Sequence, residues 1–185
     1  MAHFKAFDPR VELSGGHLSA IIQAFPAGTE KIAKSILAAR GLQDPKPDAW
    51  YSLQAVLDVM KDLYESFNPG LLTRMGSRVG QIVQLPPHWK SVDMAVKELD
   101  IGYKMNHRGG QVGSYSYEDL GTVSGLRRMK SIARTHWPCE YDFGILQGMG
   151  ERFKQPGMEV FVRKDEEAPC RKSGGDSCTY IVSWG

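Results

Sequence analysis

The strongest constraint on the fold of this chain lies in its C-terminal quarter, which holds all three cysteines. Cys139 stands at the start of a predicted helix, and the later pair follows the spacing Glu167-x2-Cys170-x7-Cys178. Zinc in proteins favours four tetrahedral ligands with thiolate sulfur among them. A hairpin that brings Cys170 to Cys178, beside the first turn of the helix, would therefore form a zinc site.

Two other interpretations of the cysteines stay open at this point. Free cysteine is often buried and packs as a small hydrophobic residue, and this alternative is as strong as zinc on chemistry alone. A disulfide is the weaker alternative, because the number of cysteines is odd. The N-terminal sequence MAHFKAFDPR also lacks the continuous apolar segment of a secretory signal.

Length and composition favour one domain with a sizeable core, since the chain has 185 residues of which 42% are apolar. Charged residues or glycines interrupt every apolar run, so we expect no membrane span and a cytoplasmic location. A net charge of +2 gives no overall attraction to nucleic acid, and we expect no direct nucleic-acid partner. The basic residues at 127, 128, 130 and 134 alternate with apolar ones, which favours a solvated strand face.

The pattern predicts an α+β domain that covers residues 1–185, with N-terminal helices packed on a C-terminal four-stranded antiparallel sheet. Residues 1–16 are interpreted as a loosely held arm or an added edge strand. Residues 28–107 form the helical part, because apolar residues recur there at the spacing of buried helix faces. The predicted helices are 28–41, 50–67, 71–84 and 91–106.

Residues 112–184 form the predicted sheet, because the apolar period there changes from 3.6 toward 2. The predicted strands are 112–118, 127–135, 158–164 and 178–184, with an embedded helix at 139–154. Gly76 and Gly80 lie on one face of a helix, as do Gly144 and Gly148 on another. Helix faces without side chains, here called bare faces, indicate the close approach of another backbone or of a bound molecule.

A series of residues in this C-terminal part resembles a known family: Pro138, Cys139, Gly144, Gly148, Gly157, Glu167, Cys170, Gly175, Asp176 and Cys178. Their order is similar to the C-terminal half of the 4-vinyl reductase domain, a family whose superfamily includes haem nitric-oxide-binding domains and TRAPP tethering subunits. The motif is most similar to sensor domains of aromatic-responsive transcriptional activators, which bind phenol-type effectors beside a structural zinc. It covers about a quarter of the chain.

The resemblance implies that the zinc ligands are Cys139, Glu167, Cys170 and Cys178. This chain is longer than the activators between Gly157 and Cys170, and it has three consecutive acidic residues at 165–167. Asp165 and Glu166 therefore stay open as alternatives to Glu167.

The resemblance also implies a mainly apolar cavity that the helices 50–67, 71–84 and 91–106 enclose against the sheet. Its predicted wall consists of Trp50, Tyr64, Phe67, Tyr103, Trp137 and Phe143, with His107 or Tyr117 as a polar anchor. For any one of these residues, a place in the ordinary core is the commoner outcome. Only the resemblance makes them candidates as a group.

Catalysis receives little support, because the chain has no nucleophile elbow, no phosphate-binding loop and no H-E-x-x-H pair. Haem or another tetrapyrrole is a less favoured ligand. Relatives in the superfamily hold haem through a helix histidine and a Tyr-x-Ser-x-Arg clamp, whereas residues 115–118 here read Tyr-Ser-Tyr-Glu. His107 and His88 are the candidate axial ligands.

The favoured interpretation is a non-catalytic sensing domain that binds a small, largely apolar or aromatic molecule. We expect a structural zinc, a homodimer and an output through a separate signalling partner, unless the chain is a fragment of a larger protein. The alternatives are a tetrapyrrole-binding protein or biosynthesis accessory factor, and a structural adaptor without a ligand.

Overall fold

The computed structural model describes residues 4–185, with all of their side chains except those of Glu30 and Pro69. The helices are α1 (Gly15–Gln23), α2 (Glu30–Ala38), α3 (Leu53–Ser66), α4 (Pro69–Ile82), α5 (Val92–Lys97), α6 (Leu99–Met105) and α7 (Cys139–Phe153). The strands are β1 (Glu12–Ser14), β2 (Trp50–Ser52), β3 (His107–Arg108), β4 (Ser114–Val123), β5 (Leu126–Arg134), β6 (Val160–Lys164) and β7 (Cys178–Trp184). A short 3₁₀ turn, η2, covers Arg171–Ser173.

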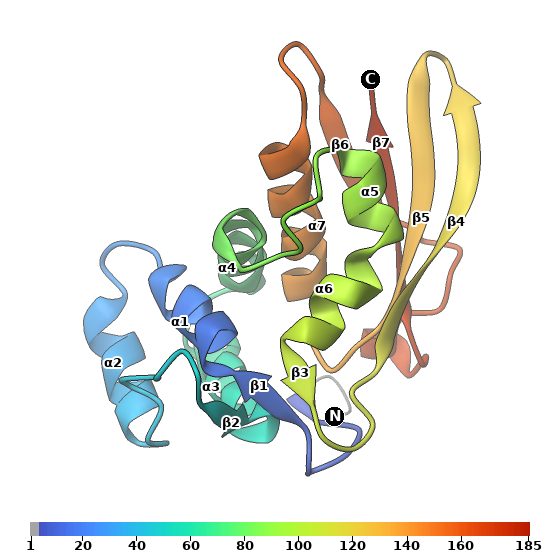
Figure 1. Ribbon diagram of the computed structural model, residues 1–185. Coiled ribbons are helices and arrows are strands. Elements are labelled where there is room, and N and C mark those ends of the chain that lie inside the picture. Colours follow the sequence, from blue (N-terminus) through green and yellow to red (C-terminus); the bar gives the residue numbers. More distant parts are fainter. Residues whose placement is uncertain (1–3) are drawn as a thin grey trace.

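The main sheet is antiparallel, with the strand order β4-β5-β7-β6. Helices α5, α6 and α7 lie on one side of it, and α1–α4 form a second group beyond α7 (Figure 1). The face of the sheet toward α7 is apolar, as the buried side chains of Met129, Ala133, Tyr180 and Val182 show. The α+β class and the four-stranded antiparallel sheet with an embedded helix are therefore confirmed.

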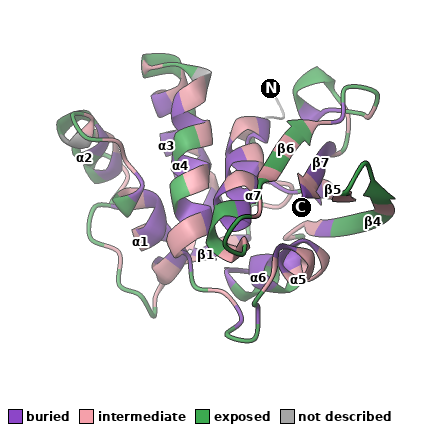
Figure 2. Ribbon diagram, turned by 90° about the horizontal axis from the view of Figure 1, so that it is seen from above, coloured by how far each residue is buried: buried purple, intermediate pink, exposed green. Residues whose placement is uncertain are grey.

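Helix α7 lies between the sheet and α4, and most of its residues are buried (Figure 2). Glycines set its distance from α4. A Cβ atom on Gly148 would lie 1.9 Å from the carbonyl oxygen of Ser77, and one on Gly76 would lie 2.2 Å from that of Tyr141. The two bare helix faces predicted from the sequence therefore pack against each other, backbone against backbone.

The N-terminal region differs from the predicted arm, whose first three residues lie outside the described residues. Residues 12–14 form β1, the central strand of a small sheet with the order β2-β1-β3, and Leu13 is fully buried. Ser14 then caps α1, because its side-chain oxygen accepts a hydrogen bond from the backbone N–H of His17. The Ser-Gly-Gly sequence begins a helix here rather than ending an arm.

The helix predicted at 91–106 is interrupted at Glu98, where the backbone leaves the helical region and separates α5 from α6. The Glu98 carboxylate accepts hydrogen bonds from His88 Nε2 at 2.6 Å and from Trp89 Nε1 at 2.9 Å. These contacts stabilise the break, and a helical period does not reveal them. None of the helices in residues 4–185 is long and apolar enough to cross a membrane.

The glycine contact between α4 and α7 gives a prediction about stability. Gly148→Ala places a methyl group against the Ser77 backbone, so we expect it to lower the free energy of unfolding by about 2 kcal/mol or more. Urea unfolding followed by circular dichroism measures the effect. The matched control is Gly16→Ala in α1, where a Cβ atom meets nothing within 4 Å. Equal stability of the two variants would contradict the prediction.

Candidate functional site

The three cysteine thiols converge on one buried point between α7 and the sheet. Cys139 is the first residue of α7, Cys178 is the first residue of β7, and Cys170 precedes η2. Their Sγ atoms all lie within 4.8 Å of one another, and none of the side chains is more than 7% exposed. The cysteines are free thiols, so the structure contains no disulfide among them.

The spacing of the sulfur atoms is close to that of a tetrahedral zinc site. Zinc–sulfur bonds of about 2.3 Å at tetrahedral angles place sulfur atoms about 3.8 Å apart. The Sγ atom of Cys170 lies 3.7 Å from that of Cys139 and 3.8 Å from that of Cys178. The Cys139–Cys178 pair, at 2.9 Å, would have to open by about 0.9 Å to reach this geometry.

Protons in the cluster are shared unequally. The thiols of Cys139 and Cys178 are hydrogen-bonded to each other, and this contact lowers the pKa of Cys178 to about 6. The same contact, together with burial, raises the pKa of Cys139. The sequence predicts a thiolate on Cys139 from the dipole of α7, whereas the hydrogen bond favours the thiolate on Cys178.

The acidic residues at 165–167 lie outside the group of converging ligand atoms. Glu167 and Glu166 are exposed, and the backbone N–H of Glu167 donates a hydrogen bond to Oδ1 of Asp165. Asp165 is mostly buried and pairs with Lys130 at 3.3 Å. The structure therefore brings together three of the four ligands that the resemblance implies, and not the Glu167 carboxylate.

A second candidate site is a small apolar cleft where α1, α6, β4 and α7 meet. Its wall includes His17, Tyr103, Tyr115 and Trp137, with aliphatic groups from α4, α6 and α7. The space within it is about 30 Å³, which suffices for a water molecule or two. Pockets for organic ligands enclose about 300–1,000 Å³, so a larger ligand requires its side chains to move.

Two buried histidines carry unsatisfied nitrogens beside this cleft. His107 bonds the Tyr103 carbonyl oxygen through Nδ1 at 2.7 Å, and its Nε2 has no partner among the described residues. His17 contacts the Tyr141 hydroxyl through Nε2 at 3.3 Å, and its Nδ1 has no partner there either. Trp137 lies 5.6 Å from the His17 ring and 5.4 Å from the His107 ring, centroid to centroid.

Burial keeps both imidazoles neutral, because it lowers the pKa of His17 to about 4 and that of His107 well below its usual value. A neutral imidazole with an unsatisfied nitrogen can accept a hydrogen bond or ligate a metal. A buried polar atom without a partner is costly, and such atoms often mark functional positions.

A buried carboxylate network extends from the cleft toward the sheet. The Tyr115 hydroxyl and the Thr135 hydroxyl each donate a hydrogen bond to Asp142. Burial raises the pKa of Asp142 to about 7, although the two hydroxyl donors oppose this shift. The network fixes the Tyr115 ring at the wall of the cleft.

Three of the eight predicted ligand-contact residues lie together: Tyr103 and Trp137 line the cleft, and His107 lies directly behind them. The other five are elsewhere. Trp50 stacks under Arg108, Tyr64 packs on Phe4, Phe143 packs on Tyr180, Tyr117 is 45% exposed on β4, and Phe67 is half-buried after α3. Helical spacing correctly identified the apolar faces of Tyr64 and Phe143 but not their neighbours, whereas Trp50 and Tyr117 lie in the strands β2 and β4.

His88 is not near this cleft, since it is exposed and pairs with Glu98. His17, by contrast, is missing from the sequence prediction because no helix or strand is predicted between residue 16 and residue 28. The available signal was Ser14 as a helix cap before Leu18, Ile21 and Ile22.

Comparison with known proteins identifies the fold and no sequence family. No protein-family profile matches this chain, and no curated protein matches it significantly in sequence. Among solved structures, an H-NOX protein from S. oneidensis in the Fe(II)NO ligation state is similar, with a TM-score of 0.69. The identity is 11%, over 94% of this chain and 99% of that chain.

A second similar structure is an oxygen-binding H-NOX domain related to soluble guanylate cyclases, with a TM-score of 0.62. Its identity is 10%, over 93% of this chain and 94% of that chain. The fold is thus similar to that of H-NOX domains. Membership of the 4-vinyl reductase family stays a prediction.

The buried His17 gives a prediction about pH. Its folded pKa of about 4 lies below its ordinary 6.5, so its neutral form contributes stability above pH 6.5 that is lost as pH falls toward 4. When the pH is lowered from 7 to 4.5, the free energy of unfolding should fall in both proteins. We expect the fall to be roughly 2–3 kcal/mol smaller in His17→Gln than in the natural chain. Urea unfolding at both pH values measures this difference.

The matched control is His88→Gln, which changes an exposed histidine. It should keep the pH dependence of the natural chain. The same loss of stability in the natural chain and in His17→Gln would show that His17 does not titrate as a buried neutral group.

Proposed function

We propose that this domain is a non-catalytic sensor that binds a small molecule at the cleft beside His17 and His107, braced by a structural zinc ion. The observation that carries the sensing site is the pair of unsatisfied imidazole nitrogens within a buried aromatic cluster. Aromatic walls with one or two polar groups are typical of small-molecule sites. The similarity in fold to H-NOX domains, among them ones studied for their haem, supports the binding of a small molecule or cofactor by this chain.

The zinc part of the proposal is supported by the sulfur distances and by the burial of the cluster. Cys139, Cys170 and Cys178 would supply three ligands, and the fourth position would be taken by the Glu167 carboxylate or by water. Zinc would tie α7 to the sheet, because its ligands come from both. It would also hold Trp137, two residues before Cys139, at the cleft.

Removal of the metal tests this part. We expect about one zinc per chain under reducing conditions, and its removal by a chelator should lower the melting temperature by about 10 °C or more. Cys178→Ser should lose the zinc and the same stability. Elemental analysis and thermal unfolding measure both effects.

Glu167→Gln and Glu166→Gln form a matched pair, because both residues are exposed acids in the same loop. Weaker zinc binding in Glu167→Gln alone would assign the fourth ligand to Glu167, and unchanged binding in both would leave water or Asp165 at that position. If the purified protein contains no zinc and its melting temperature does not change when zinc is added, the proposed structural zinc is refuted.

Haem is the second candidate ligand, and it is supported by the similarity in fold to H-NOX domains and, within this structure, by donor chemistry. The His107 Nε2 atom is buried and unsatisfied, as an axial ligand before coordination would be, and the Tyr103 carbonyl fixes its tautomer. The space does not fit a porphyrin as packed here, since the cleft holds about 30 Å³. Tyr115 is bound to Asp142, and no arginine follows it at the clamp position.

Expression with a supply of haem distinguishes the two ligand classes. If haem binds through His107, we expect a Soret band that His107→Ala removes or shifts, while His88→Ala, an exposed control, keeps it unchanged. Without a Soret band, a thermal-shift titration with phenols should raise the melting temperature of the natural chain. A Soret band that is identical in His107→Ala would contradict ligation by His107.

The proposed sensor would act as a homodimer and pass its signal to a separate partner protein. Exposed apolar side chains on α6, Ile101 at 51% and Met105 at 46%, offer a surface for such contacts. No specific feature of the described residues favours the adaptor alternative. Native mass spectrometry of the purified protein would report the subunit count, the metal and any bound small molecule together.

A further inference from the structure

An open groove, here called the entry groove, adjoins the sensing cleft at the C-terminal end of α7. One wall is the loop that joins α4 to α5, and the other is formed by residues 152–155 at and after the end of α7. The groove has a volume of about 380 Å³, within the range of small-molecule sites. Leu85 lines both the entry groove and the cleft, so the two spaces meet at this side chain.

Leu85 is placed to act as a gate between the two spaces. It is half-buried and belongs to the loop, where its side chain can change rotamer without unfolding a helix. A Cβ atom on Gly102 would lie 3.0 Å from the Cδ2 atom of Leu85, so the missing side chain leaves the room that Leu85 occupies. Trp89 and Phe153 line the groove nearby and are in ring contact, 6.0 Å between centroids.

The charge of the entry groove is positive. Lys90, Arg152 and Lys154 line it, and no acidic residue is among the described residues of its wall. Lys154 pairs with Glu151 at 2.9 Å, whereas neither Lys90 nor Arg152 forms an ion pair within the described part of the chain. Arg152 is held in place because its Nη1 donates a hydrogen bond to the Val83 carbonyl oxygen at 2.7 Å. The groove thus presents about two positive charges that no carboxylate neutralises.

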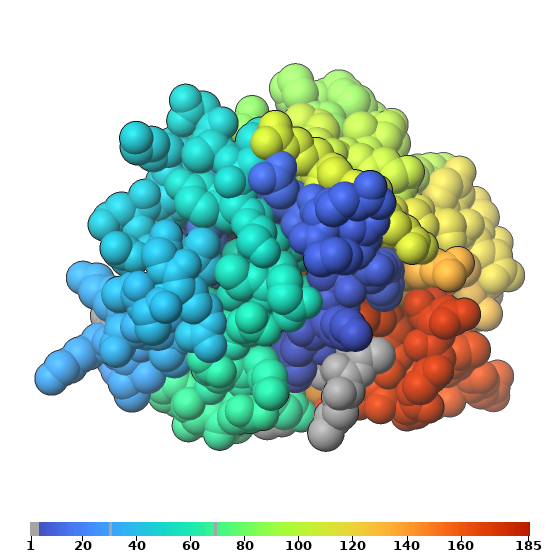
Figure 3. All heavy atoms as spheres, turned by 90° about the horizontal axis from the view of Figure 1, so that it is seen from below, coloured from blue at the N-terminus to red at the C-terminus, as the bar shows by residue number. Residues whose placement is uncertain are grey.

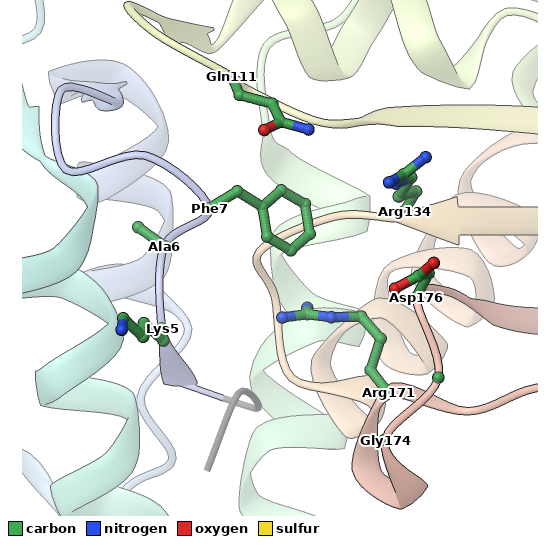
Figure 4. Close-up of a pocket in the computed structure, with 9 residues that line it drawn as sticks. Lys5, Ala6, Phe7, Gln111, Arg134, Arg171, Gly174 and Asp176 are labelled. Atoms are coloured by element: carbon green, nitrogen blue, oxygen red, sulfur yellow. The ribbon is translucent and has the colours of Figure 1, made fainter.

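A second groove, of about 410 Å³, lies beside residues 5–7 and has no such connection. Its wall contains Asp176, and Arg171 there stacks on the Phe7 ring, 4.9 Å from the ring centre (Figure 4). Seen from below, the N-terminal segment lies beside the C-terminal loop at this end of the molecule (Figure 3). No described residue lines both this groove and the cleft. Leu85 therefore connects the cleft to the entry groove, and not to this one.

We infer that the ligand of the sensing cleft is an amphipathic carboxylate that enters through the entry groove; this inference rests on the proposed sensing function. The apolar part of the ligand would pass Leu85 into the aromatic cleft. Its carboxylate would stay outside with Lys90 and Arg152, since both side chains form charge-assisted hydrogen bonds with carboxylates. The described residues that line the cleft include no lysine or arginine, and burial of an unpaired carboxylate is costly.

Isothermal titration of the full chain as purified tests the ligand class, with cinnamate and cinnamyl alcohol as probes. They share an apolar body and differ in the charged end. We expect cinnamate to bind about fivefold more tightly at low salt, and this preference should shrink as the ionic strength rises. Equal affinities would overturn the inference and leave the sensing function standing. No binding of either probe would contradict the sensing site, and the inference would fall with it.

Charge variants separate a specific contact from general attraction. Lys90→Gln and Arg152→Gln should each weaken the binding of cinnamate about threefold and leave that of cinnamyl alcohol unchanged. The control is Lys34→Gln, an exposed lysine on α2 whose loss changes the net charge equally. It should not alter the binding of either probe. Equal weakening by Lys34→Gln and Lys90→Gln, or no weakening by Lys90→Gln and Arg152→Gln, would overturn the anionic contact.

A variant of the gate tests the route. Leu85→Ala should raise the association rate of both probes severalfold, because a smaller side chain then separates the groove from the cleft. Stopped-flow tryptophan fluorescence measures this rate, since Trp137 lines the cleft. The matched control is Leu120→Ala, which shortens another half-buried leucine, on β4. An association rate in Leu85→Ala that equals that of the control would overturn entry through this groove.

Discussion

The convergence of three buried thiols is the contact on which the arrangement of this domain depends. Cys139 begins α7, Cys178 begins β7, and Cys170 lies in the loop that joins β6 to β7. Three buried thiols without a metal gain little from this proximity, because a thiol is a weak hydrogen-bond donor and its sulfur a weak acceptor. A zinc ion would turn the same arrangement into a crosslink between helix and sheet.

The position of α7 has a second cause in its glycines. Gly144 and Gly148 let α4 approach until backbone atoms meet, so α7 is held by α4 on one side and by the sheet on the other. Its N-terminal turn then brings three features close together: the cysteine cluster, the buried Asp142 and the Trp137 wall of the cleft. A metal bound at this cluster would therefore lie within a single turn of helix from the cleft.

The architecture could be predicted from the sequence because periodicity and local signals determine it. The helix that begins at Cys139, the four strands and the two glycine faces follow from spacing alone. The convergence of the cysteines required a hairpin and a helix head to meet, and the resemblance supplied that arrangement. Residues 12–14 were expected in an arm or an added edge strand, whereas they form the central strand of a small sheet, because three residues are too few to show which neighbours they pair with.

Details of the two sites could not be predicted for a physical reason. Spacing tells which face of a helix is buried, but it does not tell which side chain lies opposite. Phe143 packs against the core as expected, with Tyr180 as its neighbour, whereas Trp50 lies in β2 under the Arg108 guanidinium. His17 reaches the cleft because α1 lies near α6 and α7 in the fold, although it is far from them in the sequence. No local sequence signal predicts this tertiary arrangement.

The central claim concerns the ligands of one metal ion, and X-ray absorption at the zinc edge of the purified protein tests it most directly. We predict three sulfur neighbours at about 2.3 Å and one lighter oxygen or nitrogen neighbour. A spectrum with only oxygen and nitrogen neighbours, or protein that contains no zinc, would contradict it.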